Sequence, residues 1–131
     1  MGKFNSFEEI NSWQKARILN KKIYQITDAD AFRKDFDLAR QIRRCSVSIS
    51  SNIAEGFERN TDKEFIHFLY IAKGSAGEVR SQLYLALDLN YISQEIFNDL
   101  LVEITEISRL LSGFINTLIN KVCYGLYDLR L

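Results

Sequence analysis

Apolar residues along much of this chain recur at spacings of three and four, the period of a helix with one buried face. The first such run predicts a helix over residues 7–27, opened by a capping box of Ser6 and Glu9. Its apolar positions are Ile10, Trp13, Ala16, Leu19, Ile23 and Ile26. Residues 28–36 have no clear period and predict a connection, with at most a short helical turn around Phe32.

A second helix is predicted over residues 38–58, with Asp37 as its N-cap. Its apolar face is Ile42, Cys45, Ile49 and Ile53, and four serines lie between or beside these positions: Ser46, Ser48, Ser50 and Ser51. Serine competes for backbone hydrogen bonds and is only a fair helix former. So many serines favour a central helix that its neighbours approach closely. The alternatives are a serine-rich surface or a serine-rich loop.

A third helix is predicted over residues 62–89, opened by a second capping box of Thr61 and Glu64. Its apolar seam advances in alternating steps of four and three, the heptad spacing of helices that pack at a shallow angle. The seam consists of Phe65, Leu69, Ala72, Ala76, Val79, Leu83 and Ala86. This helix should therefore run alongside its neighbours over most of its length.

Asn90 can adopt the left-handed conformation that ends a helix, and Ser93 is the expected cap of a fourth helix over residues 94–123. Gly125 is expected to end that helix, and the tail over residues 125–131 has no assigned structure. Because the connections after the second and third helices are short, consecutive helices should be antiparallel neighbours. The pattern predicts one all-α domain spanning all 131 residues, an antiparallel up-and-down four-helix bundle.

The composition is that of a globular chain, with 47% hydrophobic and 26% charged residues. The absence of proline suits long uninterrupted helices. No apolar run of about 18 residues predicts a membrane span, and no secretory signal opens the chain, so a cytoplasmic location is expected. Cys45 and Cys123 lack the spacing of a metal site and are interpreted as small buried apolar residues.

The predicted third helix has more apolar surface than one seam requires. Beside the seam lie Phe68, Ile71, Leu85 and Leu89 on one flank, and Ile66, Tyr70, Tyr84, Leu87 and Tyr91 on the other. Each glycine inside a helix costs about 1 kcal/mol relative to alanine, so Gly74 and Gly77 favour close backbone approach. We expect a homo-oligomer whose interface includes Tyr70, Gly74, Gly77, Tyr84 and Tyr91. Alternatively, the glycines could accommodate a fourth helix of the same chain.

The sequence does not predict a catalytic or metal site. Glu64 and His67 have one half of a di-metal carboxylate spacing, but His67 is the only histidine and Glu64 already serves a capping box. No histidine is placed as a base for a serine nucleophile, and no glycine-rich phosphate loop is present. We therefore expect no enzyme activity, no metal and no cofactor.

Several polar residues lie in the most motif-like parts of the predicted second and third helices. They are interpreted as a structural polar network made of Asn52, Glu55, Ser75 and Glu78. Buried polar groups need partners, so such a network would fix helix register or a subunit contact. Alternatives are ligand binding by Asn52 and Glu55, or an approach of Glu55 to Glu78 as paired carboxylates.

The basic excess lies in the first part of the chain. Residues 1–59 hold 11 Lys/Arg and 8 Asp/Glu, a net charge of +3, and residues 60–131 hold 6 and 9, a net charge of −3. Because arginine forks match phosphate geometry, a nucleic-acid-binding patch is predicted from Lys15, Lys21, Lys22, Arg40, Arg43, Arg44 and Arg59. No glycine-and-aromatic platform accompanies them, so contact with backbone or shape is expected. The alternative is a solvated face, with Arg43 or Arg44 paired to Glu55, Glu58 or acids of another subunit.

Motif-like segments recur from about residue 7 to residue 118. They are Trp13-Gln14-Lys15-Ala16, Gln41-Ile42-Arg43-Arg44, Ser48-Ile49, Asn52-Ile53-Ala54-Glu55-Gly56, Glu64-Phe65, Phe68-Leu69, Ala72-Lys73-Gly74-Ser75, Glu78 and Leu89-Asn90-Tyr91-Ile92. In these segments the chain resembles the bacterial four-helix-bundle proteins encoded within intervening sequences of large-subunit ribosomal RNA genes. It departs from that family in the connection over residues 28–36, where the family usually has a proline.

The resemblance implies a four-helix bundle similar in fold to the accessory variability determinant of diversity-generating retroelements, a homopentamer that assists a reverse transcriptase and its RNA. It therefore implies a homo-oligomer, here a pentamer, with structured RNA or an RNA-processing protein as partner. The predicted function is a non-enzymatic scaffold or adaptor acting through the basic patch. The alternative is a protein–protein interaction module with no nucleic-acid role. Small-ligand binding in the core is disfavoured because Leu, Ile and Phe fill the seams.

Overall fold

The computed structural model describes the backbone of residues 4–128 and the side chains of residues 4–124. Over the described backbone it contains five α-helices, one short 3₁₀ turn and no β-strand, which confirms the all-α prediction. The elements in chain order are η1 (Phe7–Glu9), α1 (Asn11–Thr27), α2 (Asp30–Lys34), α3 (Phe36–Phe57), α4 (Asp62–Asp88) and α5 (Gln94–Asp128).

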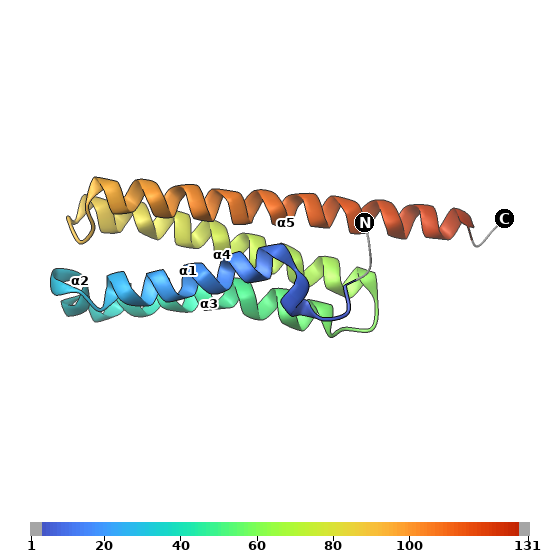
Figure 1. Cartoon of the computed structure of the whole chain (residues 1–131), viewed down its shortest axis with the longest axis horizontal. Coiled ribbons are helices and arrows are strands. Elements are labelled where there is room, and N and C mark those ends of the chain that lie inside the picture. The colour runs from blue at the N-terminus through green and yellow to red at the C-terminus, as the bar shows by residue number, and fades with distance from the viewer. Residues whose placement is uncertain (1–3, 129–131) are drawn as a thin grey trace.

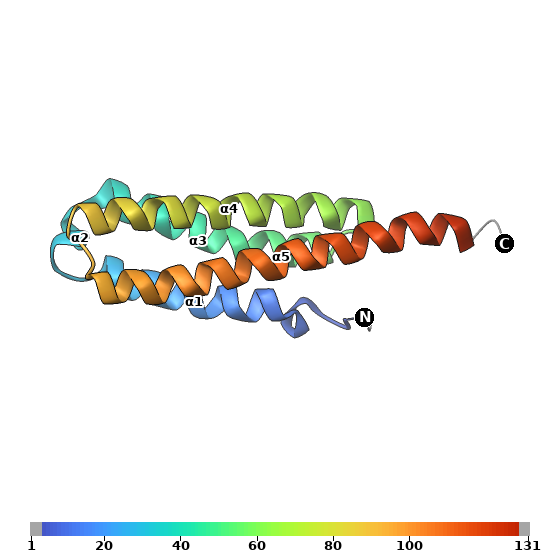
Figure 2. The same ribbon diagram turned by 90° about the horizontal axis from the view of Figure 1, so that it is seen from above.

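The four long helices lie side by side along one axis, and consecutive long helices run in opposite directions (Figures 1 and 2). α3 packs against α1 on one side and against α4 on the other, while α5 contacts both α4 and α1. The helix contacts therefore close into a ring in the order α1, α3, α4, α5. The short α2 lies at the end of the molecule where the chain turns from α1 into α3 (Figure 1).

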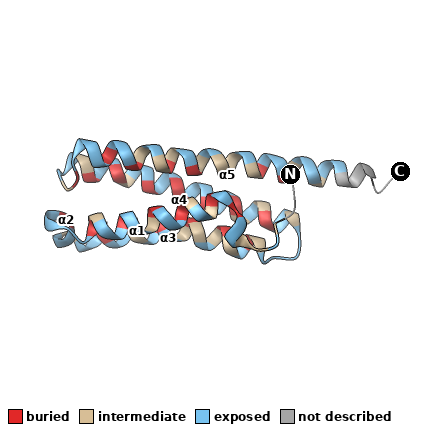
Figure 3. Ribbon diagram, in the orientation of Figure 1, coloured by how far each residue is buried: buried red, intermediate tan, exposed pale blue. Residues whose placement is uncertain are grey.

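The core is formed by one buried stripe from each long helix (Figure 3). All seven positions of the predicted seam in α4 are buried, which confirms the heptad pattern. The most deeply buried large side chains come from every long helix and include Leu19, Ile23, Ile42, Ile49, Ile53, Leu69, Leu83, Ile104, Ile107 and Leu111. Burying each such side chain contributes roughly 1.5–3 kcal/mol.

Two predicted helix ends are confirmed in detail. Thr61 caps α4, since the Glu64 N–H donates to its hydroxyl oxygen at 3.2 Å. Asn90 has a φ of 58° after the end of α4. The N–H groups of Asn90 and Tyr91 then donate to the carbonyls of Leu87 and Ala86, both at 2.9 Å, and so satisfy the last turn of the helix.

The predicted starts of the first two long helices are corrected by the structure. The Glu9 carboxylate accepts a hydrogen bond from the Ser6 N–H, but it closes the 3₁₀ turn η1. The extended backbone of Ile10 (φ −74°, ψ 123°) separates that turn from α1. The cap of α3 is Asp35 rather than Asp37, because the Leu38 N–H donates to the Asp35 carboxylate at 3.1 Å. The short helical turn expected around Phe32 is present as α2.

The predicted end of the last helix is also corrected. α5 continues through Gly125 to Asp128, so Gly125 does not terminate it, and residues 129–131 of the predicted tail lie outside the described range. The helix extends beyond the ends of its neighbours (Figures 1 and 2). Cys123 is consequently exposed, contrary to its interpretation as a buried residue, whereas Cys45 is buried. Within residues 4–128, no helix has a segment that is both long and apolar enough to cross a bilayer.

Gly56 lies where α3 closely approaches α4. A Cβ atom at this position would lie 2.7 Å from the Phe68 Cβ and 2.9 Å from the Phe65 Cδ1. The Phe68 Cβ is fixed to the backbone of α4 and cannot move by a simple rotamer change. The packing of α3 on α4 therefore requires glycine at this position.

Replacing Gly56 by alanine should lower the free energy of unfolding by about 1–3 kcal/mol, because the added methyl overpacks the interface between α3 and α4. Gly113→Ala is the matched control, since a Cβ there has no atom within 4 Å. That change should be neutral or stabilise the helix by up to about 1 kcal/mol. Urea unfolding of both variants measures the difference, and equal midpoints would contradict the close approach at Gly56.

Candidate functional site

Three of the four serines of α3, Ser46, Ser48 and Ser50, lie at its contacts with the neighbouring helices, and Ser51 is exposed. On the α1 side, the fully buried Ser46 donates its hydroxyl to the Asn20 Oδ1 at 2.7 Å, and the Asn20 Nδ2 donates to the Ser50 Oγ at 3.0 Å. On the α4 side, the Ser75 hydroxyl donates to the Ser48 Oγ at 3.0 Å. The serine-rich stretch is therefore a helix with polar contacts across both seams, and the loop interpretation is excluded.

The four residues predicted to form one polar network divide into separate contacts. Asn52 donates its amide to the Ser48 hydroxyl at 2.9 Å, so Asn52 and Ser75 meet through Ser48. Glu78 instead contacts the Cys45 thiol, and Glu55 pairs with Arg59 at 3.6 Å. Glu55 lies ten residues beyond Cys45 on α3, about 15 Å along the helix axis, so Glu55 and Glu78 do not approach each other.

Cys45 lies beneath this polar seam as a neutral thiol. Its Sγ is 3.5 Å from the Glu78 Oε2 and accepts from the Gln82 amide at 3.7 Å. Burial raises the pKa of the Cys45 thiol above its usual value, and the negative charge of Glu78 raises it further. The thiol therefore acts as a hydrogen-bond donor to Glu78 rather than as a nucleophile.

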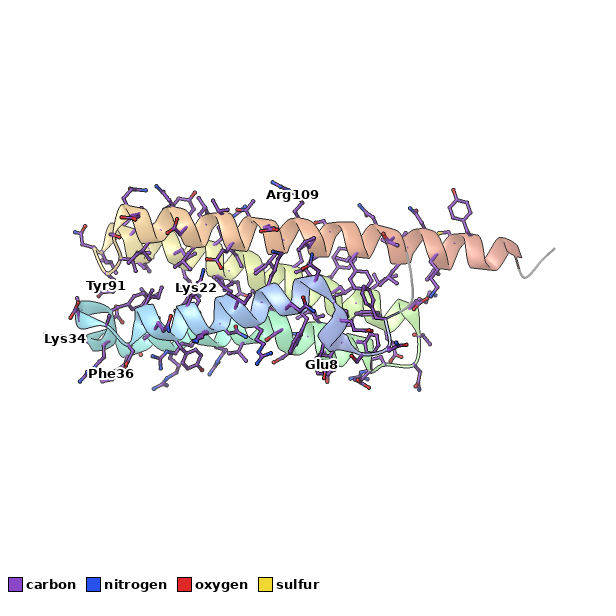
Figure 4. All side chains as sticks on the ribbon, in the orientation of Figure 1. Glu8, Lys22, Lys34, Phe36, Tyr91 and Arg109 are labelled. Atoms are coloured by element: carbon purple, nitrogen blue, oxygen red, sulfur yellow. The ribbon has the colours of Figure 1, made fainter. Side chains whose placement is uncertain are left out.

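Three of the seven basic residues of the predicted patch have carboxylate partners in the chain. Lys15 contacts Glu106 at 3.3 Å and Lys22 contacts Glu103 at 2.8 Å, so both lysines point from α1 toward α5 (Figure 4 labels Lys22). Arg59 contacts Glu55 and Glu64, the longer contact being 3.8 Å, and its guanidinium lies 4.7 Å from the Phe68 ring centroid. These three residues do not join the arginines of α3 in one surface.

The remaining arginines surround a groove of about 750 Å³ at the end of the molecule where α1, α2 and α3 meet. Arg40, Arg43 and Arg44 come from α3, and Arg33 joins them from α2. The one acidic side chain in the lining of this groove is that of Asp28. The full lining, here called the arginine groove, is Tyr24, Thr27, Asp28, Arg33, Phe36, Ala39, Arg40, Arg43, Arg44, Val47, Ser48 and Ser51.

Arg43 is held in a fixed position within the arginine groove. Its Nε donates to the Thr27 hydroxyl oxygen at 2.7 Å, and Thr27 in turn donates to the Ile23 carbonyl at 2.7 Å. The guanidinium carbon lies 4.5 Å from the Tyr24 ring centroid, the geometry of a cation–π contact. Among the described residues, neither terminal nitrogen of Arg43 has a hydrogen-bond partner, so its outer edge can bind a ligand.

Across the described side chains, none of the four groove arginines has a carboxylate oxygen within 4.0 Å. The pairing considered for Arg43 or Arg44 with Glu55 or Glu58 does not form within the chain. Arg33, Tyr24 and Phe36 line the groove but were not predicted from the sequence as site residues. The adjacent basic residues Arg33 and Lys34 could have indicated a basic site. They lie in the aperiodic connection, however, and no sequence pattern predicts where that connection packs relative to α3.

The outer face of α4 carries the residues predicted for an oligomer interface. Tyr70 and Tyr84 are about half exposed, and no atom lies within 4 Å of a Cβ placed at Gly74 or Gly77. These glycines therefore do not accommodate another helix of the same chain. Two of these tyrosines also have partners within the chain. The Tyr84 ring lies 4.9 Å from that of Phe97 on α5, and Tyr91 donates its hydroxyl to Asp35 at 2.9 Å with its ring 5.2 Å from that of Phe32.

The fold and sequence place the chain among known proteins. A sequence model described as 23S rRNA-intervening sequence protein matches residues 8–113. The chain belongs to this family. The matched range contains the whole arginine groove and the outer face of α4. The resemblance noted from the sequence motifs is thereby confirmed.

One solved structure from the S23 ribosomal protein family supports the same assignment. It is the crystal structure of a protein of unknown function from Bacteroides thetaiotaomicron VPI-5482, which is 29% identical with a TM-score of 0.74. The similarity covers 79% of this chain and 97% of that chain. No curated protein matches the sequence.

The two cysteines should differ strongly in reactivity. Cys45 is buried and its raised pKa lowers the thiolate fraction, so iodoacetamide at pH 8 should modify it much more slowly than the exposed Cys123. Peptide mass spectrometry over time measures both rates. Protein unfolded in urea is the control, in which the two rates should converge. Equal rates in the folded protein would contradict the burial of Cys45.

Proposed function

We propose that this protein is a non-enzymatic, homo-oligomeric scaffold or adaptor that binds structured RNA through the arginine groove. The observation that carries the proposal is the cluster of four arginines around one groove, with no carboxylate oxygen within 4.0 Å of any of them among the described residues. Arginine forms bidentate contacts with phosphate, so such a groove suits a nucleic-acid backbone.

The proposed scaffold is an antiparallel up-and-down four-helix bundle formed by α1, α3, α4 and α5 as one domain. The closed ring of helix contacts and their alternating directions support this interpretation. A rigid bundle suits a binding role, because Arg40 and Arg44 then project from a regular helix at a fixed spacing. Arg43, held by Thr27 and Tyr24, is already ordered before a ligand arrives.

The charge distribution favours a local interaction. The formal net charge of the chain is zero, so the whole molecule has no strong attraction for RNA. In a homo-oligomer the groove would be repeated, and several weak phosphate contacts would act together. The description of the family refers to an intervening sequence of 23S rRNA, which supports RNA as the class of partner.

A second candidate is a protein–protein interaction module without a nucleic-acid role. It is favoured by the exposed apolar side chains of α4 and its C-cap: Tyr70, Ile71, Tyr84, Leu85 and Leu89. The outer face of α4 would form the subunit contact of the proposed homo-oligomer, for which the resemblance implies a pentamer. The two candidates differ in whether the arginine groove is required.

Removing two groove charges should weaken RNA binding. Arg40→Gln/Arg44→Gln should bind a labelled hairpin from 23S ribosomal RNA roughly tenfold or more weakly at 100 mM salt. The slope of log affinity against log salt should fall by about 1–2, since each lost phosphate contact lowers it by about 0.7–0.9. Fluorescence anisotropy across a salt series measures both quantities.

The matched control is Lys15→Gln/Lys22→Gln, which removes the same charge from residues paired with α5. This control should bind the hairpin like the wild-type protein and lose less than about 1 kcal/mol of stability per ion pair. An equal loss of affinity in both double variants would contradict a specific groove. Absence of binding at low salt in correctly folded protein would favour the protein–protein module.

The outer face of α4 should control assembly without controlling folding. Light scattering of the wild-type protein should give a multiple of the 15.2 kDa chain mass. Gly77→Leu should lower that multiple while leaving the melting temperature of the subunit nearly unchanged, because the site is open in the single chain. Gly113→Leu is the matched control and should assemble normally. A monomeric wild-type protein at high concentration would rule out the homo-oligomer.

A further inference from the structure

We infer that the arginine groove binds RNA at an unpaired nucleotide, with the base stacked on Phe36 and the adjoining phosphates on the arginines. This inference rests on the proposed RNA-binding function and names the kind of RNA element that the groove would select. It goes beyond the backbone or shape contact expected from the sequence, because the structure adds an aromatic ring to the cluster of arginines.

Phe36 is the most exposed large hydrophobic side chain among the described residues, at 74%. It lies at the first position of α3 and is not among the side chains that pack on the core. Its ring therefore contributes little to folding and is open to a ligand. Figure 4 places it at the same end of the molecule as Lys34 and Tyr91.

The backbone on both sides of Phe36 is anchored by neighbouring residues, so the exposed ring is attached to an ordered segment. Before it, the side chain of Phe32 is fully buried and anchors α2 in the core. Asp35 caps α3 through the Leu38 N–H at 3.1 Å and also accepts the Tyr91 hydroxyl at 2.9 Å. A ring on such an ordered support can stack on a base with little loss of conformational freedom.

The charged residues around Phe36 determine on which side of the ring the phosphates of a stacked nucleotide would lie. On one side the ring lines the arginine groove with Arg33 and Arg40. On the other side it lines a hollow of about 450 Å³ whose charged residues are Lys34, Asp35 and Asp37. The carboxylates repel phosphate from that hollow, so the phosphates of a nucleotide stacked on Phe36 should lie on the groove side.

The two aromatic rings of the arginine groove have different roles. The guanidinium of Arg43 already lies over the Tyr24 ring, so Tyr24 orders an arginine. Phe36 makes no such contact with a cation among the described residues and has no hydrogen-bonding group of its own. Because the interior bases of an RNA duplex are covered on both faces, a phenylalanine ring within a groove stacks on a base that is unpaired and turned out of the helix.

The groove is also large enough for one nucleotide. Its volume of about 750 Å³ falls within the roughly 300–1,000 Å³ of small-ligand sites. The exposed hydroxyl of Ser51 lines it beside the arginines and can donate to or accept from sugar and base edges, whereas the Ser48 hydroxyl oxygen already accepts from Asn52 and Ser75. A bulged or looped-out nucleotide thus meets a stacking surface, cations and a hydroxyl in one place.

The test compares two RNA hairpins that differ only in one base. The first carries a single bulged adenosine, and the second has an abasic residue at the same position. The wild-type protein should bind the first about 5- to 150-fold more tightly, the range expected for one stacked base. Phe36→Ala should bind both hairpins equally, whereas Phe36→Trp should keep the preference for the bulged base.

Two further variants separate stacking from charge. Tyr124→Ala removes another exposed aromatic side chain, at 67%, far from the groove and should leave both affinities unchanged. Arg40→Gln/Arg44→Gln should weaken binding of both hairpins while retaining the preference for the bulged base. Melting curves of all variants should match the wild type, since none of the four substituted side chains is in the core.

Each outcome bears on the inference. Equal wild-type affinity for the two hairpins, with both weakened by the arginine variant, would overturn base stacking and leave the proposed RNA-binding function in place. No binding of either hairpin at low salt would overturn both. Tight binding of polyglutamate that depends on Arg40 and Arg44, together with no RNA binding, would identify the groove as a site for an acidic protein.

Discussion

The close approach of α3 to both of its neighbours is the constraint on which the fold and the groove depend. Small residues make this approach possible: Gly56 against the backbone-fixed Cβ of Phe68, the fully buried Ser46 beside α1, and Ser48 against Ser75 of α4. Hydroxyls packed between helices would each cost about 1–3 kcal/mol if unpaired. Hydrogen bonds across the seams to Asn20 and Ser75, together with the bond from Asn52 to Ser48 within α3, remove that cost. The two bonds between helices also fix the helix register.

This packing also decides which face of α3 remains available. With α1 on one side and α4 on the other, the outward face of α3 carries Arg40, Arg44, Val47 and Ser51, all exposed. The wall of the groove opposite them is set by Tyr24 at the end of α1 and by α2. The candidate site is therefore a product of helix packing and of the turn from α1 to α3, so a change at either place would alter its shape.

Features with a period or a local rule could be predicted from the sequence, and features that depend on distant partners could not. The seam of α4, the Thr61 cap and the left-handed Asn90 follow from local patterns and were found. The carboxylate partners of Lys15 and Lys22 lie 91 and 81 residues away on α5. The separation of Glu55 from Glu78 is set by the antiparallel register of α3 and α4, which places Glu78 beside Cys45 instead. The Asp35 cap and the exposed Phe36 lie at the edge of an aperiodic connection, where no spacing assigns a residue to a cap or to a surface.

The sorting of charge between helices explains why the groove arginines remain available for the proposed ligand. The lysines of α1 that face α5 are neutralised by Glu103 and Glu106, so part of the basic excess of the first half is used within the fold. Arg40 and Arg44 are one helical turn apart, and such like-charged pairs destabilise a helix by about 0.2–0.5 kcal/mol. Asp37 lines a hollow beside both arginines, but among the described residues no carboxylate oxygen lies within 4.0 Å of either. Arg33 and Arg43 line the same groove, in which Asp28 is the one acidic residue. A bound phosphate would offset the repulsion between Arg40 and Arg44, and this gain would contribute to the affinity for the proposed anionic ligand.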